Sequence, residues 1–402
     1  MRTRRSLIYS LLAGLFGLCL TVTLHACQAP QTSAPSRPSP TPEVAQSPTP
    51  TETPLPPATQ AIVNSVGGKG LFKPDRGDVR LVVISDLNSY YGATVYDPEV
   101  DKGVKLVPFW NPDMVLCSGD MVAGQDPTLT DTRLQEMWAA FDRQVATPLR
   151  QMKIPYGFTV GNHDASSALS LSGQFLFQRE RDATAAYWKD PAHDPGVQFV
   201  DKSDFPFYYT FEYKDIFFVV WDGSSNHIPP EKLAWVEKTL ASDKAQAAKL
   251  RILIGHLPLY AVAIGRNEAA EVMENADELR AMLEKYNVHT YISGHHHTYY
   301  PAHKGKMQLL HMGILGSGPR PYIDSDQPPR KSLTVIDVKF DSAELTTYTT
   351  YDMQTLQVIK YEELPRMIVG VNGMVMRRDV EQLTSAEQQQ CDNQIGVAGC
   401  RA

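Results

Sequence analysis

Five short apolar segments of the sequence are each followed at once by residues that bind metal ions in proteins. Their turns combine aspartate, asparagine and histidine with a neighbouring glycine or other small residue. In chain order these turns are Ser85-Asp86-Leu87-Asn88, Gly119-Asp120, Gly161-Asn162-His163-Asp164, Gly255-His256 and Gly294-His295-His296-His297. Carboxylate, amide and imidazole groups without a thiolate suit hard or borderline divalent cations, and a carboxylate can bridge two of them. The residue types therefore favour a centre of two metal ions.

Apolar, β-branched segments of strand length recur from residue 79 onward, with helical patterns between them. Segments that are apolar on both faces are typical of a covered sheet. The predicted strands are 79–85, 114–117, 156–160, 207–213, 216–221, 251–254, 288–292, 307–312 and 332–338, and the predicted helices are 131–149, 230–241 and 268–285. Side chains in the turns would project from the carboxyl edge of such a sheet. The fold class is therefore α/β.

The ordered set of turns resembles the calcineurin-like metallophosphoesterases, with GNHD and GHHH as its most specific parts. This resemblance implies two mixed β-sheets packed as a sandwich flanked by helices, a four-layer fold over about residues 75–350. It also implies hydrolysis of a phosphate monoester by a metal-bound hydroxide. Two alternatives stay open, a phosphodiesterase with the same centre and a non-catalytic, metal-binding surface lipoprotein.

The resemblance implies the ligands of both ions and leaves their identity open among manganese, iron, zinc, magnesium and calcium. The expected ligands are Asp86 and His297 for the first ion, Asn162, His256 and His295 for the second, and Asp120 as a bridge between them. The expected catalytic residues are His163 and Asp164. His163 would act as a general acid or phosphate-binding group, and Asp164 would hold its ring in position.

Asn88 stands where the family usually has histidine. An amide oxygen is a weaker and harder donor than imidazole, so with Asn88 as a ligand the first site should bind more weakly and favour manganese, magnesium or calcium over zinc. Alternatively, Asn88 only caps its turn, and a water, Tyr90 or Tyr91 takes the position. Purple acid phosphatases have a tyrosine ligand where this chain has Ala123, so no iron–tyrosinate chromophore is expected.

The first residues have the layout of a secretory signal, a basic start followed by an apolar run over 7–24. Leu24-His25-Ala26-Cys27 resembles the lipobox of bacterial lipoproteins, although His25 departs from the small residue usual there. We expect removal of residues 1–26, a lipid on Cys27, and a membrane-anchored protein that faces the periplasm or the cell surface. A retained transmembrane anchor is the alternative, and the export route could be general secretory or twin-arginine.

Residues 27–61 are rich in proline, serine and threonine, which predicts an extended linker behind the lipid anchor. Residues 351–402 are expected to form a tail, in which Cys391 and Cys400 could pair in an oxidising compartment. The formal charge of 38 − 45 = −7 argues against general nucleic-acid binding. The expected partners are therefore a phosphate-ester substrate and, through the lipid, a membrane.

Two loops are candidates for substrate recognition. Residues 165–205 could form a lid that carries Arg179 and Arg181, although a helix packed on the sheet is the preferred interpretation. The glycine-rich loop 316–320 could cradle a phosphate, but it lacks the lysine of a nucleotide P-loop, so a plain strand connection is preferred. His227 is a further candidate for the cleft.

Overall fold

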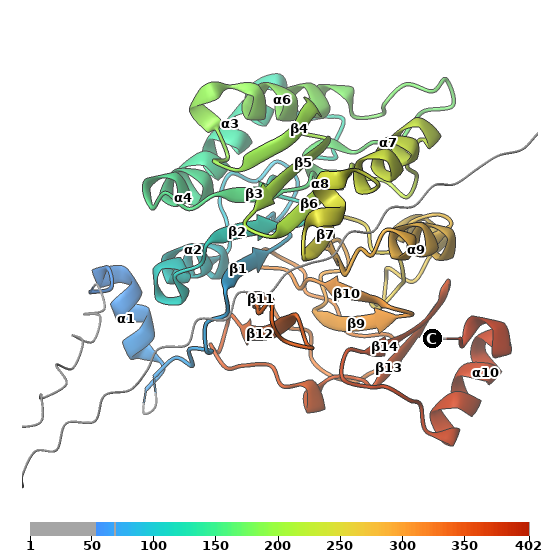
Figure 1. Ribbon diagram of the computed structural model, residues 1–402. Helices are drawn as coiled ribbons and strands as arrows, with labels where there is room; N and C mark the ends of the chain where they lie inside the picture. Colours follow the sequence, from blue (N-terminus) through green and yellow to red (C-terminus); the bar gives the residue numbers. More distant parts are fainter. Residues whose placement is uncertain (1–53, 68–69, 402) are drawn as a thin grey trace, which may run out of the picture. The chain divides into compact units, whose positions relative to one another are not determined.

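The computed structural model describes residues 54–67 and 70–401 (Figure 1). One sheet of five strands is found in this part of the chain. Its strands are β1 (Val79–Ile84), β2 (Met114–Cys117), β3 (Tyr156–Phe158), β11 (Ser332–Val338) and β12 (Thr346–Asp352). They lie in the order β12–β11–β1–β2–β3. Strands β1, β2 and β3 are parallel while β11 and β12 pair antiparallel, so this sheet is mixed.

The second sheet has nine strands among the described residues. They are β4 (Gln198–Asp204), β5 (Tyr208–Tyr213), β6 (Ile216–Val220), β7 (Leu250–Ile254), β8 (Thr290–Ser293), β9 (Tyr300–Lys304), β10 (Met307–His311), β13 (Met367–Gly370) and β14 (Gly373–Arg377). Their order is β13–β14–β9–β10–β8–β7–β6–β5–β4. The central strands β6, β7, β8 and β10 are parallel, and the pairs on either side are antiparallel.

Helices cover the outer faces of both sheets. Those of the first sheet are α2 (Pro98–Trp110), α3 (Asp131–Phe141), the π-helix η1 (Asp142–Ala146), α4 (Thr147–Gln151) and α6 (Gln178–Lys189). Those of the second are α7 (Pro230–Leu240), α8 (Asp243–Ala247) and α9 (Ala276–Lys285). The others are α1 (Pro57–Ser65), α5 (Asn162–Ala165), α10 (Ser385–Gly399) and the 3₁₀ turns η2 (Pro191–His193), η3 (Ala269–Glu271) and η4 (Tyr361–Glu363).

Strand β1 shows how the layers are joined. Leu81 and Val83 face the core between the two sheets, whereas Val82 and Ile84 face the core beneath the helices. A strand that is buried on both faces must be apolar or have its charges paired, so β1 is apolar except for Arg80, whose buried guanidinium pairs with Asp337 at 2.9 Å. The fold is a four-layer α/β sandwich, and the expected fold class is confirmed.

The expected domain limits are wrong at both ends. Helix α1 lies inside the predicted linker, where the hydroxyl of Thr59 donates to the carbonyl of Lys105 at 2.6 Å. The predicted tail adds the hairpin β13–β14 to the second sheet beside β9. Proline-rich composition concealed α1, and the two tail strands are too short to show a clear alternation. The folded unit therefore extends from Pro54 through the tail.

The nine predicted strands are all present, but other predictions need correction. Strands β4, β9 and β12 were not predicted. Strand β4 is an edge strand with mostly exposed residues, β9 contains Pro301, and β12 is rich in threonine, so none of them has a continuous apolar pattern. The helix predicted over 268–285 begins only at Ala276. Asn275 precedes it with a φ of 54°, a left-handed conformation that prevents the helix from extending backward.

No helix in residues 54–67 and 70–401 has the length and apolar character needed to cross a bilayer. The predicted signal over 1–26 and the predicted lipid site Cys27 lie outside the described residues.

Candidate metal centre

The predicted ligands converge at one edge of the sandwich. Their turns follow β1, β2 and β3 of the first sheet and β7 and β8 of the second, and neighbouring strands of each set are parallel. The ligand atoms of Asp86, Asp120 and His256 lie within 4.8 Å of one another, and all three residues are buried. The structure therefore brings together turns that are far apart in the sequence.

Backbone conformation aims these side chains into the centre. Asp86, Asp120, His295 and His297 all have φ values between 49° and 64°, in the left-handed region that residues with a Cβ seldom adopt. Gly161 allows the close approach of the next turn, because a Cβ there would lie 2.1 Å from Oδ1 of Asp120. Such conformations persist only where the surrounding structure enforces them, and they are common at functional sites.

The hydrogen-bond pattern of two imidazoles shows what the centre can hold. Oδ1 of Asn162 lies 2.9 Å from both Nε2 of His256 and Nδ1 of His295. The opposite ring nitrogens face acceptors. Nδ1 of His256 lies 2.7 Å from the carbonyl oxygen of Ser118, and Nε2 of His295 lies 2.6 Å from the carboxylate of Glu271. A neutral imidazole that donates outward presents a lone pair inward. Nitrogen and oxygen lone pairs then oppose each other, as they do around a cation.

The first site repeats this pattern. Nδ1 of His297 contacts the carbonyl of Gly318 at 2.9 Å, and its Nε2 lies 3.3 Å from Oδ1 of Asp86. Oδ2 of Asp120 is buried without a hydrogen bond to any described residue, although Nε2 of His256 is 3.3 Å away. A buried carboxylate oxygen without a donor is costly unless a cation compensates it. These donors fit divalent cations, with Asp86, His297 and Asp120 able to hold one and Asp120, Asn162, His256 and His295 able to hold another.

Burial and charge set the protonation of this cluster. Burial alone would lower the pKa of His256, but the carboxylate of Asp120 more than offsets it and raises the pKa to about 9. Burial, together with the charge of His256, holds the pKa of His295 well below its usual value. A cation must displace the proton of His256, so metal affinity should rise as the pH increases toward 9.

His163 lies beside the centre, but Asp164 does not orient its ring. The backbone N–H of His163 donates to Oδ1 of Asp120 at 2.8 Å, and its Nδ1 contacts the carbonyl of Gly124 at 2.8 Å. The carboxylate of Asp164 instead accepts from three backbone N–H groups, those of Met121, Val122 and Gly161. Asp164 therefore fixes the turns that carry Asp120 and Asn162, which makes it a positioning residue.

Asn88 is only 5% exposed at the edge of the centre. Its backbone N–H approaches the carbonyl of Asp120 at 3.3 Å, and its carbonyl accepts from Ser317 at 3.0 Å. Its side-chain amide makes no hydrogen bond to another described residue, so the amide does not cap the turn. Tyr91, the expected substitute, is 57% exposed, and its ring lies 5.4 Å from that of His163.

Two functional groups were not predicted from the sequence. Glu271 accepts from His295, and the carbonyl of Gly318 orients His297, so the loop 316–320 is more than a strand connection. Neither has a local signal, because one is a loop glutamate and the other a backbone atom. The only available signal was indirect. Histidines that bind a metal usually donate their other ring N–H to an acceptor, so acceptors were to be expected beside His295 and His297.

The remaining predicted candidates lie elsewhere. Residues 165–205 form α6 and β4 for much of their length, and buried Arg181 pairs with Asp222 at 2.8 Å. His227 is exposed and pairs with Glu274 at 3.1 Å. Cys391 and Cys400 form a disulfide at α10.

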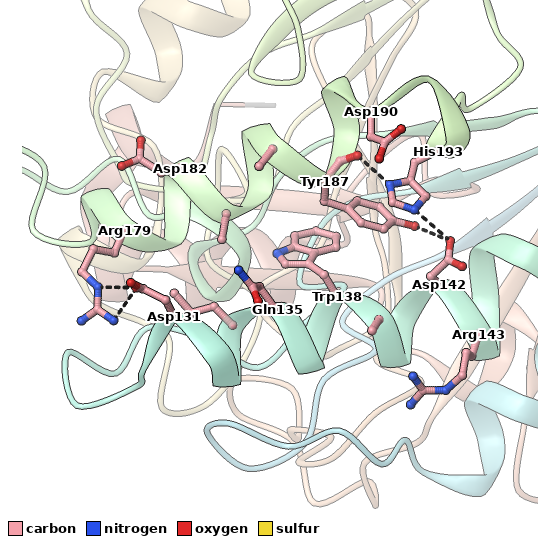
Figure 2. A pocket seen from close by; sticks show the side chains of 14 residues that line it. Asp131, Gln135, Trp138, Asp142, Arg143, Arg179, Asp182, Tyr187, Asp190 and His193 are labelled. Atoms are coloured by element: carbon pink, nitrogen blue, oxygen red, sulfur yellow. Dashed lines mark hydrogen bonds and ion pairs between the residues drawn. The ribbon is translucent and has the colours of Figure 1, made fainter.

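A separate pocket of about 720 Å³ lies between α3 and α6 (Figure 2). Trp138 and Tyr187 stack in its wall, and Arg179 pairs with Asp131 at its rim. None of the candidate metal ligands lines it, so it carries no part of the chemistry considered above.

Replacing Glu271 with alanine should weaken the second metal site. Loss of the acceptor on Nε2 frees the ring of His295 to rotate and lowers its basicity, which typically costs about 10–100-fold in metal affinity. Calorimetric titration of the metal-free protein with manganese would measure this. Glu274→Ala, which removes a nearby surface carboxylate, is the control and should bind as the wild type does. Equal affinities for all three proteins would exclude a role of Glu271 in metal binding.

Replacing Asn88 with histidine should tighten the first site and shift its preference from manganese toward zinc, because imidazole is the softer and more basic ligand. The measurement is metal content per chain after exhaustive dialysis, followed by zinc–manganese competition. The wild type should lose one ion more readily than the other. Two equally retained ions in the wild type, with no change in Asn88→His, would mean that Asn88 already suffices or that another group binds there.

Comparison with known proteins agrees with this geometry. The sequence profile described as calcineurin-like phosphoesterase (Metallophos) matches residues 79–299. No curated protein sequence matches the chain significantly. Among solved structures, purple acid phosphatase PPD1 from yellow lupin (Lupinus luteus) seeds is similar in fold, with a TM-score of 0.51, 16% identity, and coverage of 73% of this chain and 56% of that one.

Two further solved structures have lower scores. GAP50, described as the anchor in the inner membrane complex of Plasmodium, gives a TM-score of 0.44 and 13% identity over 78% of this chain and 94% of that chain. A structure described as a putative 5′-nucleotidase from Staphylococcus aureus gives a TM-score of 0.37 and 12% identity, with coverage of 78% of this chain and 57% of that chain. The profile match includes all five turns and more than half of the chain. The chain therefore belongs to the calcineurin-like phosphoesterase family.

Proposed function

We propose that this protein hydrolyses phosphate esters, with monoesters as its main substrates, at a centre of two divalent cations. The observation that carries the proposal is the meeting of inward imidazole nitrogens with the oxygens of Asp86, Asp120 and Asn162. Bound divalent cations would lower the pKa of a water and neutralise the oxygens of a phosphoryl group. Monoesters are favoured because they carry more negative charge than diesters for the two cations to neutralise.

The residues of the chain would contribute position and a proton. His163 is held by Gly124 through Nδ1, which leaves Nε2 free at a partly exposed position next to Asp120. In hydrolysis the oxygen of water bonds to phosphorus, and the bond to the leaving-group oxygen breaks. When both ring nitrogens carry a proton, Nε2 of His163 is suited to give one to that leaving oxygen. The exposed ring of Tyr91 lies against His163 and would limit its movement.

His163→Ala should slow hydrolysis of p-nitrophenyl phosphate by roughly 10²–10⁴-fold, the range for a positioned acid–base group. Its metal content should stay unchanged, because alanine keeps the backbone N–H that contacts Asp120. Steady-state kinetics and metal analysis of the same sample separate the two effects. Asp120→Ala should lose metal and activity together, and His193→Ala, in the pocket of Figure 2, should lose neither. A His163→Ala protein as active as the wild type would remove His163 from the mechanism.

The wild-type assay also decides between ester classes. It should run with added manganese on p-nitrophenyl phosphate and on bis(p-nitrophenyl) phosphate. Faster turnover of the diester would favour a phosphodiesterase. No turnover of either ester by protein that retains metal would favour the non-catalytic alternative.

We further propose that the protein acts outside the cytoplasm, anchored by a lipid on Cys27. The basic and apolar start of the sequence supports this location, and so does the disulfide between Cys391 and Cys400, since disulfides persist in oxidising compartments. Cys27→Ser should be released from membranes or remain unprocessed, whereas Cys19→Ser, within the predicted signal, should behave as the wild type. Wild-type protein that incorporates no labelled fatty acid would disprove the anchor.

A further inference from the structure

Two arginines lie directly behind the histidines of the candidate centre. Arg266 Nη1 contacts the same carboxylate oxygen of Glu271 that accepts from His295, with an N–O distance of 2.5 Å. The backbone N–H of Arg320 donates to the carbonyl of His297 at 3.3 Å. Both arginines are therefore placed beside the centre by contacts to a predicted metal ligand or to the carboxylate that holds one.

The loops that carry the arginines are held side by side. The backbone N–H of Ile264 donates to the carbonyl of Pro321 at 3.0 Å, and Ala263 forms a bridge with Tyr322. Arg320 extends across to the other loop, since a Cβ on Gly265 would lie 2.7 Å from its Nη1. Gly265 and Gly318 are both exposed, so this surface is open to solvent.

The guanidinium of Arg320 has no partner in the described part of the chain. Its Nε is buried, makes no hydrogen bond, and no ion pair involves the side chain among those residues. The Nε of Arg266 is likewise buried without a partner.

One carboxylate lies near the two arginines. Glu271 is shared between Arg266 and His295, and it forms no ion pair or hydrogen bond with Arg320, although it lies close enough for its charge to attract that guanidinium. Arginine stays protonated in proteins, so a partly buried guanidinium without a partner is costly unless an anion binds it. Its planar donors suit a carboxylate or a phosphate. The unmet donors therefore indicate an anionic ligand.

We propose that Arg320, assisted by Arg266, binds a second anionic group of the substrate, a carboxylate or a phosphate on the leaving-group portion. The inference rests on the proposed function, because it assumes that a phosphoryl group occupies the metal centre. Neither guanidinium forms a hydrogen bond or ion pair with a predicted metal ligand among the described residues, so the arginines would reach a group attached to the phosphoryl rather than the phosphoryl itself. The substrate class is then a phosphate monoester that carries an additional acid group.

The test compares two non-hydrolysable phosphonates of matched length, 3-phosphonopropionate and propylphosphonate, which differ in one carboxylate. Their dissociation constants are measured by calorimetry on manganese-loaded protein. The wild type should bind 3-phosphonopropionate about tenfold or more tightly, as expected for a charge-assisted hydrogen bond. Arg320→Gln should lose that preference, and Arg320→Lys should keep part of it. Arg179→Gln, which removes an exposed arginine of the distant pocket, should keep all of it.

Several outcomes would overturn the proposal. In the wild type, these are the absence of a preference for 3-phosphonopropionate and the absence of binding of either phosphonate. In Arg320→Gln, they are a preference that survives and an equal loss of affinity for both ligands, which would place Arg320 on the phosphonate itself. Metal content of each variant must match the wild type, which excludes damage to the centre. Turnover of p-nitrophenyl phosphate separates the two hypotheses. If the wild type turns over p-nitrophenyl phosphate but does not prefer 3-phosphonopropionate, only the arginine site is contradicted. If it prefers 3-phosphonopropionate but does not turn over p-nitrophenyl phosphate, only the proposed hydrolysis is contradicted.

Discussion

Lone pairs of imidazole nitrogens, carboxylates and an amide converge at one edge of the sandwich, and the rest of the fold must hold them there. Without a cation or an added proton, such groups oppose one another in a site that excludes most water. Four left-handed residues at the centre each cost on the order of 1–3 kcal/mol as well. The two sheets, joined by a large core of apolar and aromatic side chains, provide the rigidity that resists both effects. The stability of the scaffold thus maintains a locally unfavourable arrangement.

Orientation of the rings depends on groups behind them. His256, His295 and His297 each direct one nitrogen to an acceptor outside the centre, namely the carbonyl of Ser118, the carboxylate of Glu271 and the carbonyl of Gly318. Two of these acceptors lie in the loops that also carry Arg266 and Arg320. The same loops therefore orient the rings of the ligands and place the two arginines. Metal binding and recognition of a second anion would then share their structural support.

The turns at the centre were predictable because each follows a buried strand. Asp86, Asp120 and His256 could be placed together, since parallel strands direct their carboxyl ends to one edge. Glu271 and Arg266 could not, because they lie in a loop whose position depends on contacts between distant segments. Arg320 lies in the loop 316–320, which the sequence offered as a possible phosphate cradle, although a plain strand connection was preferred. The role of Asp164 was misjudged for a similar reason. Adjacency to His163 suggested a side-chain contact, whereas the backbone folds so that its carboxylate meets three N–H groups of nearby turns.

The hairpin β13–β14, expected to lie in a tail, is fastened to the loop that carries Arg266. The backbone N–H of Val371 donates to Asn267 at 2.6 Å across 104 residues, and the side chain of Asn372 donates to the carbonyl of Leu259 at 2.6 Å across 113. The support of this loop therefore depends on residues more than a hundred positions later in the chain, and contacts of such long sequence separation form slowly. A change in the hairpin would then reach the surface beside the centre without altering any predicted metal ligand.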